Sequence, residues 1–310
     1  MNPFTSARRP NRLTHFTPLR YPGGKGKLAA FIKRVLQRNH LLDGEYVEPY
    51  AGGAAIALEL LLHEYVSHVY INDISRPVFA FWRSVVDDTE RLCRLVRNTR
   101  LTMEVRDRQK RILMNQDDHD DLALGFAMFF LNRTNRSGIL NAGVIGGRDQ
   151  SGLWKIDARY NADELVSRIM AIARLKCRIS VTGLDALEFL REGGTRWPPK
   201  TLIYCDPPYY IKGRDLYYDY YEHEDHERVA FFVTHQIRRQ KWIVSYDNVK
   251  QVRDLYAGFK MIAYRIGYSA KSSRRGTEVM FFCDGLKEVP ELVGPVKEIG
   301  ERRSSSKDVA

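Results

Sequence analysis

An apolar run at residues 202–205 stops abruptly at Asp206-Pro207-Pro208-Tyr209, and this junction constrains the fold more than any other part of the sequence. Two consecutive prolines fix two φ angles and keep the residue before them out of the helical region. The run therefore reads as a buried strand ending in a stiff elbow that holds the Asp206 carboxylate near the Tyr209 ring. Ligands of open α/β sheets bind just beyond the carboxyl ends of strands, so the elbow predicts a binding site. The alternative is a turn that needs proline only to end the strand.

Strand-like and helix-like patterns alternate on both sides of this elbow. We expect strands at residues 45–48, 66–71, 179–182, 202–205 and 242–245, and a closing pair at 261–266 and 278–283. We expect helices at residues 54–62, 76–100, 186–191 and 225–239. Strands separated by helices predict an α/β fold with a mostly parallel, Rossmann-like sheet.

The alternation breaks at residues 99–165, where charged sequence is followed by polar, glycine-rich sequence. We interpret this segment as an inserted, mainly helical domain. It divides the main α/β domain into residues 15–98 and 166–289. Residues 1–14 are polar and basic and are expected to form a flexible arm, and residues 290–310 are expected to form a disordered tail.

The net charge of the chain limits the classes of binding partner that we expect. The 310 residues contain 49 Lys and Arg against 38 Asp and Glu, a formal net charge of +11. A balance of this size favours a polyanionic partner such as nucleic acid, although a basic protein without such a partner is the alternative. The four cysteines form no Cys-x-x-Cys pair, so we expect reduced thiols in a cytoplasmic protein and no structural zinc. No apolar run suggests a signal peptide or a membrane span.

A second motif precedes the elbow. Residues 48–55 read Glu-Pro-Tyr-Ala-Gly-Gly-Ala-Ala at an expected strand-to-helix junction, where small residues let the backbone approach a ligand closely. Asp73 follows Gly53 by about 20 residues, at the end of the next expected strand, where an acid can bind ribose hydroxyls. The full Gly-x-Gly-x-x-Gly pattern is absent, which fits a nucleoside cofactor without pyrophosphate better than NAD. A tight structural turn is the alternative.

A third motif lies near the start of the chain. Residues 19–27 read Leu-Arg-Tyr-Pro-Gly-Gly-Lys-Gly-Lys. A phosphate-binding P-loop needs a glycine, four further residues and then Gly-Lys directly followed by Ser or Thr. Here Leu28 follows Lys27, and that spacing does not occur. The motif therefore does not indicate a nucleoside triphosphatase.

In their order along the chain, from residues 19–27 through 48–55 to 206–209, the three motifs resemble those of the Dam-type (alpha-class) DNA adenine N6-methyltransferase family, over about residues 18–285. The resemblance implies a site-specific DNA methyltransferase that transfers a methyl group from S-adenosylmethionine to N6 of an adenine flipped out of double-stranded DNA. Residues 99–165 would be its target-recognition insert. It also implies a cytoplasmic, nucleoid-associated protein encoded by a bacterium, phage or mobile element. We expect a monomer, with or without a cognate restriction enzyme, and no metal, because in-line methyl displacement needs none.

The resemblance also assigns roles to individual residues. The residues that would bind the cofactor are Tyr21, Lys25, Glu48, Tyr50, Gly52, Asp73, Asp185 and Asp206. The residues that would act on the target adenine are Asp206, Pro207, Pro208 and Tyr209. The residues that would contact DNA lie in a recognition signature at 131–138 and in a late loop, and are Arg133, Asn135, Arg136, Ser137, Lys271, Arg274 and Arg275.

The chemistry of adenine explains why such an elbow is needed. The exocyclic nitrogen is a poor nucleophile because its lone pair is conjugated with the ring. Asp206 and the carbonyl oxygen of Pro207 can each accept an N–H hydrogen bond and so favour a tetrahedral nitrogen. Tyr209 can stack on the purine and replace the lost base stacking, which is worth about 1–3 kcal/mol.

The sequence departs from the family at two places. Tyr21 and Pro22 stand where the members that methylate GATC commonly have Trp-Ala, and residues 139–141 do not match their base-reading residues. We therefore expect an adenine target other than GATC. The alternatives left open are an RNA adenine methyltransferase, a DNA cytosine-N4 methyltransferase, and a non-catalytic DNA-binding regulator on the same fold.

Overall fold

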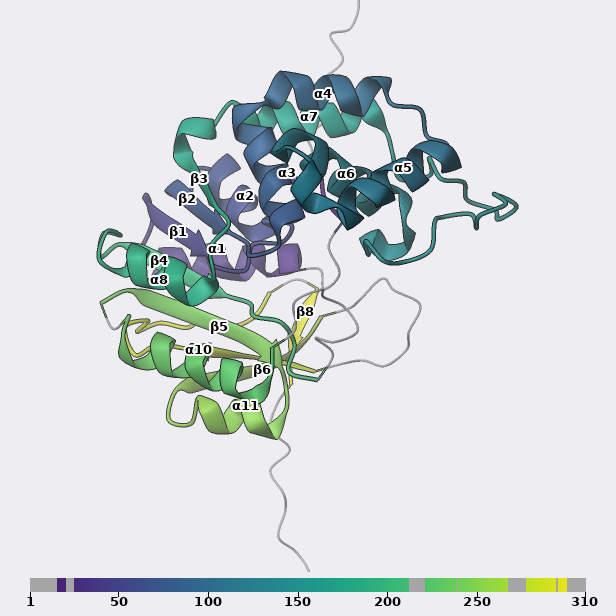
Figure 1. The fold of residues 1–310 in the computed structure, drawn as a ribbon. Coiled ribbons are helices and arrows are strands. Elements are labelled where there is room, and N and C mark those ends of the chain that lie inside the picture. Colours follow the sequence, from purple (N-terminus) through teal and green to yellow (C-terminus); the bar gives the residue numbers. More distant parts are fainter. Residues whose placement is uncertain are drawn as a thin grey trace, which may run out of the picture.

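The computed structural model describes residues 16–20, 25–211, 221–237, 239–266, 277–293 and 295–299. In this part of the chain, eight strands form one sheet in the order β3-β2-β1-β4-β5-β7-β6-β8 (Figure 1). The strands are β1 (Gly44–Glu48), β2 (Val66–Asn72), β3 (Ile179–Thr182), β4 (Thr201–Cys205), β5 (Lys241–Asp247), β6 (Lys260–Ile266), β7 (Glu278–Phe282) and β8 (Val296–Glu298). Strands β3, β2, β1, β4 and β5 are parallel, and β7, β6 and β8 extend the sheet in antiparallel pairs. The expected mostly parallel α/β fold is confirmed.

The order of the strands creates a binding position in the middle of the sheet. From β1 the chain moves outward to β2 and then β3, and it returns to place β4 on the other side of β1. The carboxyl ends of β1 and β4 therefore lie side by side at a topological switch point, where open α/β sheets bind ligands. Glu48 ends β1 and Asp206 follows β4, so both residues stand at this point.

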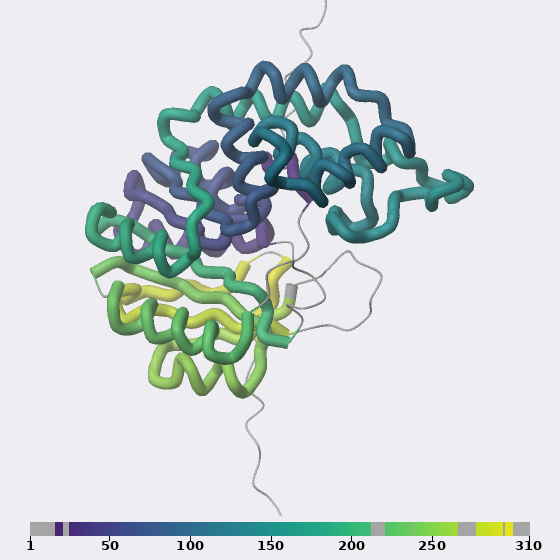
Figure 2. The backbone as a smooth tube through the Cα atoms, in the orientation of Figure 1, coloured from purple at the N-terminus to yellow at the C-terminus, as the bar shows by residue number. Residues whose placement is uncertain are grey.

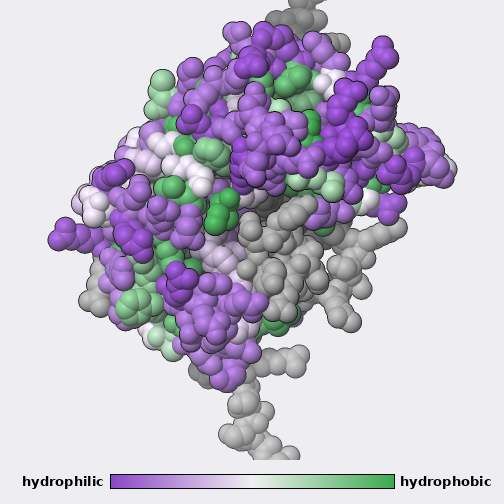
Figure 3. All heavy atoms as spheres, in the orientation of Figure 1, coloured by the Kyte–Doolittle hydropathy of each residue, from purple (hydrophilic) through white to green (hydrophobic). Residues whose placement is uncertain are grey.

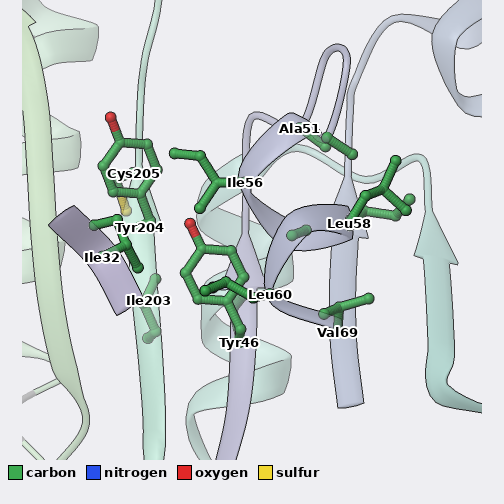
Figure 4. Close-up of a cluster of buried hydrophobic side chains, with 14 of the residues drawn as sticks. Ile32, Tyr46, Ala51, Ile56, Leu58, Leu60, Val69, Ile203, Tyr204 and Cys205 are labelled. Atoms are coloured by element: carbon green, nitrogen blue, oxygen red, sulfur yellow. The ribbon is translucent and has the colours of Figure 1, made fainter. Parts of the chain in front are cut away.

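Helices cover the sheet. They are η1 (Lys25–Leu28), α1 (Ala29–Arg38), α2 (Ala55–Leu62), α8 (Ala186–Gly194), α10 (His223–His235) and α11 (Lys250–Leu255). Figure 4 shows Tyr46 of β1 and Tyr204 of β4 among the apolar side chains of Ile32 and Ile56. These four side chains are at most 2% exposed. The sheet therefore carries a dry core directly beneath the switch point.

A second layer of helices lies beside the β1–β3 half of the sheet (Figures 1 and 2). It consists of α3 (Arg76–Asp87), α4 (Thr89–Asn98), α5 (Met103–Met114), α6 (Asp121–Thr134) and α7 (Ala162–Ala173). Helix α6 packs on α3 and α5, while α4 packs on α7. The expected insert at residues 99–165 is therefore part of a larger helical layer, and its boundaries stay a proposal. Hydrophilic side chains cover most of this layer on the face drawn in Figure 3.

Local sequence explains where several helices begin. The side chains of Thr102, Asp120, Asn161 and Asp185 each accept a backbone N–H at the start of α5, α6, α7 and α8. Helix α2 begins only at Ala55, because Ala54 adopts the left-handed conformation with φ of 45°. Across the described residues, no helix combines the length and apolarity that a membrane crossing requires.

Two elements differ from the sequence-based expectation. The helix expected over residues 76–100 is two helices, because the backbone leaves the helical region at Asp88, where φ is −128°. Residues 296–298, expected in a disordered tail, form β8, which pairs with β6 and buries Val296 to 2% exposure. Both features depend on contacts with distant parts of the chain.

Candidate active site

The elbow after β4 is held from both sides. Pro207 is buried, and the segment that follows it is fixed by Asp247 at the end of β5. The carboxylate of Asp247 accepts the backbone N–H groups of Tyr210 at 2.9 Å and Ile211 at 3.1 Å. This clamp, which sequence analysis missed, sets the direction in which Asp206 and Tyr209 project.

Lys25 links the first motif to the elbow. Its Nζ lies 2.8 Å from Oδ1 of Asp206 and 2.9 Å from Oε2 of Glu278. The hydroxyl of Ser245 donates to the same Oδ1 atom at 2.6 Å. Asp206 is 23% exposed, whereas Glu278 is 2% exposed. The structure thus brings together Lys25 and Asp206, as expected from the motifs, and adds Ser245 and Glu278.

Burial and charge act in opposite directions on this cluster. Burial raises the pKa of Asp206 above its ordinary value, and this outweighs the opposing effect of Lys25. Burial disfavours the Lys25 ammonium, yet Asp206, Tyr264 and Glu278 hold its pKa well above 10.5. Lys25 therefore remains a cation beside a carboxyl group that holds its proton more tightly than an exposed aspartate does.

The small-residue loop is braced by Asp73 and Trp82. Oδ2 of Asp73 accepts the backbone N–H of Gly52 at 2.8 Å. The indole of Trp82 donates to the carbonyl oxygen of Gly52 at 2.9 Å. Gly52 has φ of 47°, a conformation that glycine adopts without strain. Asp73 therefore shapes the loop as well as facing the cavity beyond it.

Glu48 lies beneath the same loop. Its Oε1 accepts the backbone N–H of Ala57 at 3.1 Å, and its side chain is 4% exposed. Burial raises the pKa of Glu48 to about 8. Glu48 is therefore mainly neutral at pH 7 and can donate a hydrogen bond as well as accept one.

A cavity of about 930 Å³ lies at the switch point. The cavity-lining residues that the motifs predicted for cofactor or target are Lys25, Glu48, Tyr50, Gly52, Asp73, Asp206, Pro208 and Tyr209. Pro207 and Asp185 do not belong to this set. Pro207 is buried, whereas Asp185 is exposed and caps α8, since its Oδ1 accepts the N–H groups of Leu187 and Glu188 at 2.9 and 3.2 Å. Tyr21 lies outside the described residues.

The recognition signature at residues 131–138 joins α6 to the start of the chain. Asn132, which the predicted site did not include, accepts the backbone N–H of Arg20 at 2.7 Å and donates to the Arg20 carbonyl at 2.8 Å. Gly138 has φ of 78°, and a Cβ there would lie 2.2 Å from the carbonyl oxygen of Arg20. The Asn and Gly of the signature therefore hold the backbone at Arg20.

The predicted DNA-contacting residues fall into three groups. Arg136 and Ser137 are exposed, and Arg133 is half-buried at the cavity wall. Asn135 is fully buried and uses its amide to bind the carbonyls of Ile139 and Leu140. Its position excludes direct contact with DNA, so we assign it to holding the recognition loop. Lys271, Arg274 and Arg275 lie outside the described residues.

Four arginines gather at the same end of the cavity, namely Arg20, Arg133, Arg159 and Arg168. Burial, followed by the nearby charges of Arg20 and Arg168, lowers the pKa of Arg133 to about 10. Among the described residues, the ion pair of this group is that of Arg168 with Glu164. The cavity therefore has a positive end, which suits a phosphate or another anion.

Metal ligation has no support in the described part of the chain, where no three His, Cys, Asp or Glu side chains gather in a manner suited to an ion. His226 is buried, and its Nδ1 lies 3.0 Å from the hydroxyl of Tyr246.

The fold and the cavity define a class of protein. A switch-point cavity between a small-residue loop and an Asp-Pro-Pro-Tyr elbow is typical of an α/β protein that binds a ligand at the carboxyl ends of its strands, and the positive end favours an anionic partner. Residues 21–266 match the sequence model of the D12 class N6 adenine-specific DNA methyltransferases, and the chain belongs to this family. This membership confirms the family and the enzyme class expected from the motifs.

A curated relative agrees with this assignment. The type II methyltransferase M.MjaIII of Methanocaldococcus jannaschii is 24% identical over 277 residues, which cover 80% of this chain and 91% of the relative. The chain is thus an adenine-specific DNA methyltransferase, and S-adenosylmethionine is the methyl donor of its family.

Proposed function

We propose that the chain methylates N6 of one adenine in a short recognition sequence of double-stranded DNA, with Asp206, Pro207 and Tyr209 holding the target base. The observation that carries the proposal is the position of Asp206. It follows β4 at the switch point and faces the cavity that Lys25 and Asp73 also line. A carboxylate turned away from this cavity would be unable to reach both substrates.

The volume of about 930 Å³ and the polar lining of the cavity support S-adenosylmethionine as its occupant. Ala51, Gly52 and Ala54 leave room for a ligand against the backbone, while Asp73 offers acceptors for ribose hydroxyls. The residues proposed to hold the cofactor are Lys25, Glu48, Tyr50, Gly52 and Asp73, with Tyr21 retained from the sequence motif. When bound, S-adenosylmethionine supplies an electrophilic methyl group on its sulfonium sulfur.

Asp206 is proposed to orient the amino group of the target. Among the described residues, both polar contacts of its carboxylate, with Lys25 and Ser245, are made through Oδ1. The other oxygen, Oδ2, is therefore available to accept an N–H of adenine. The carbonyl of Pro207 would accept the second N–H, so that the nitrogen lone pair is turned away from the ring. The proton released after transfer then leaves to solvent.

Tyr209 is proposed to stack on the extruded base. Its hydroxyl donates to Oε1 of Glu278 at 2.9 Å, which limits rotation of the ring. Extruding a base costs a few kcal/mol, and stacking on an aromatic side chain returns about 1–3 kcal/mol of this.

The positive end of the cavity is proposed to neutralise phosphates near the extruded base. Arg133 and the exposed Arg136 and Ser137 support this, and the sequence adds Lys271, Arg274 and Arg275. Phosphate contacts position the duplex, whereas sequence is read at base edges.

Modified-base sequencing of DNA from cells that express the protein tests the proposal. We expect N6-methyladenine at a single short motif other than GATC. Methylated cytosine, or the absence of any modified base despite cofactor binding by the purified protein, would refute the proposed reaction. N6-methyladenine at GATC would leave the reaction standing and would show that the expected target is wrong.

The name of the archaeal relative supports a further part of the proposal, a role in restriction and modification beside a cognate endonuclease. We also propose that the enzyme acts as a monomer in the cytoplasm of a bacterium or of a phage-infected cell. Light scattering of the purified protein with and without DNA measures the oligomeric state directly.

A further inference from the structure

We infer that Glu278 is a positioning residue with two effects. It shares the Lys25 ammonium with Asp206, and it fixes the Tyr209 ring through the phenol hydroxyl. The inference rests on the proposed roles of Asp206 and Tyr209. Sequence analysis placed Glu278 at the start of a strand and at the end of the late loop, residues 274–278, which resembles a loop that the family places against DNA.

Both oxygens of Glu278 are engaged, by groups from three different parts of the fold. Oε2 lies 2.9 Å from Nζ of Lys25 in η1 and accepts the hydroxyl of Tyr264 in β6 at 2.7 Å. Oε1 accepts the hydroxyl of Tyr209 in the elbow at 2.9 Å. Glu278 thus joins the cofactor side of the cavity to the target side.

The position of Glu278 is costly for a side chain with no function. It opens β7, whose five residues are all buried, and it is itself 2% exposed. Burying a carboxylate costs several kcal/mol unless charged and hydrogen-bonding partners compensate. The three donors provide this compensation. An amide or an apolar side chain would pack in the strand more simply, so the charge itself requires an explanation.

Charge sharing provides one. Lys25 carries one positive charge and contacts Asp206 at 2.8 Å and Glu278 at 2.9 Å. With both acids ionised, the three groups have a net charge of −1. A lysine paired with Asp206 alone would neutralise that carboxylate and weaken it as an acceptor for the target amino group. Because Glu278 competes for the same ammonium, Asp206 retains more of its charge.

Among the described residues, the other side chains that hydrogen-bond to Asp206 and Lys25 are neutral, while the charge of Asp206 contributes to the raised pKa of Glu48, which is about 8. Ser245 of β5 donates to Asp206 and lies 2.8 Å from the hydroxyl of Tyr204 in β4. Tyr204 and Tyr264 have pKa values raised by burial, so both phenols stay protonated at neutral pH. In the described part of the chain, Glu278 opposes the effect of Lys25 on Asp206, since it raises the pKa of Asp206 where Lys25 lowers it.

The second proposed effect of Glu278 is on the orientation of the Tyr209 ring. Nζ of Lys25 lies 5.7 Å from the centroid of the Tyr209 ring, and the phenol hydroxyl is tied to Glu278. Lys25 and Glu278 therefore fix the position of both the Tyr209 ring and the Asp206 carboxylate. A shift of Glu278 would disturb base stacking and acceptor orientation together.

The test is Glu278→Gln in the full chain, assayed by single-turnover methylation between pH 5 and pH 9 with saturating cofactor and DNA. The variant leaves Lys25 to Asp206 alone, so the pKa of Asp206 falls. We expect the acidic limb of the rate profile to move to lower pH. We expect a plateau rate roughly tenfold lower, because Asp206 becomes a weaker acceptor, with cofactor affinity changed less than the rate.

Tyr264→Phe is the matched control. It removes one hydrogen bond from the same carboxylate without changing any charge. We expect its acidic limb to coincide with that of the wild type. A limb shifted equally in both variants would show that Glu278 has only a packing role and would overturn the inference.

Glu278→Asp keeps the test decisive if the glutamine variant does not fold. The shorter side chain retains the charge but draws both oxygens back, from Tyr209 and from Lys25. We expect the acidic limb to move less than in Glu278→Gln, and we expect reduced capture of the base, measured with 2-aminopurine at the target position. Wild-type behaviour in both measurements would overturn the inference. A wild-type enzyme that methylates no adenine would instead refute the proposed function.

Discussion

The proposed role of Asp206 depends on a difference between its two carboxylate oxygens. Lys25 and Ser245 both contact Oδ1, and the elbow holds the carboxylate at the cavity. The motif Asp-Pro-Pro-Tyr predicts the elbow, but it says nothing of which oxygen is occupied. That distinction decides how a substrate amino group can be oriented.

Asp206→Asn should abolish methyl transfer, with a loss of about 10²-fold or more, because a preorganised electrostatic contact to the reacting group is removed. Binding of DNA should change little, since phosphate contacts supply most of the affinity. Single-turnover methylation and fluorescence anisotropy measure the two quantities. Asp254→Asn, an exposed position on α11 paired with Lys250, is the matched control. Wild-type turnover in Asp206→Asn would contradict the assigned role.

Glu48 makes stability depend on pH. Its pKa is about 8 in the folded protein against an ordinary 4.5, so the folded state binds the proton more tightly than the unfolded chain. The resulting stabilisation is complete below pH 4.5 and is lost as the pH rises through 8, at about 1.4 kcal/mol for each pKa unit. Glu48→Gln should remove this dependence and be the more stable protein at pH 8.5. Urea unfolding at pH 5 and pH 8.5, without cofactor, compares the two proteins; parallel losses in both would contradict the prediction.

At the scale of elements, the strands follow from local sequence. The run predicted at residues 202–205 is β4, and the strand predicted at 179–182 is β3 with the same limits. A short apolar run bounded by turn residues indicates a buried strand, and this pattern can be recognised within a few consecutive residues. The break between α3 and α4 was not predicted. In the structure, α3 packs on α6 and α4 packs on α7. Such a break depends on partners that are distant in the chain.

Helix α6 carries the recognition signature and packs unusually close to α3. A Cβ on Gly125 would lie 2.6 Å from the carbonyl oxygen of Ala80 and 2.7 Å from Cα of Phe81. Both contacts are with backbone and cannot rotate away. Gly125→Ala should therefore destabilise the protein by about 1–3 kcal/mol, despite the better helix propensity of alanine. Thermal unfolding measures the change.

Gly194→Ala is the control for this prediction. Gly194 ends α8, and a Cβ there would meet Ile237 at an ordinary contact distance of 3.5 Å. We expect a neutral or slightly stabilising effect. Equal destabilisation by both substitutions would show that the close approach of α6 to α3 is not the cause.

At the scale of the whole molecule, the net charge of +11 and the positive end of the cavity predict binding that depends strongly on salt. Affinity for duplex DNA should fall by about 10³-fold or more between 50 and 200 mM salt if six or more phosphates are contacted. Arg136→Gln should reduce the slope of log K against log salt by about one. Arg253→Gln, on α11 at the opposite end of the molecule from the helical layer, should leave the slope unchanged (Figure 1). Equal slopes for all three proteins would remove Arg136 from the DNA interface.

The sequence alone determined the α/β class, the three motifs and the family, because each is written in residues that lie close together along the chain. It also predicted Lys25, Asp73 and Asp206 as parts of one site, through the resemblance of their motifs. It did not reveal Glu278, which meets Lys25 across 253 positions of the sequence. It placed Asn135 at the DNA and Asp185 at the cofactor, whereas the structure buries the first and uses the second to cap a helix. Only the tertiary structure decided these matters, because burial and the partners of a charge depend on which distant strands and helices pack around it.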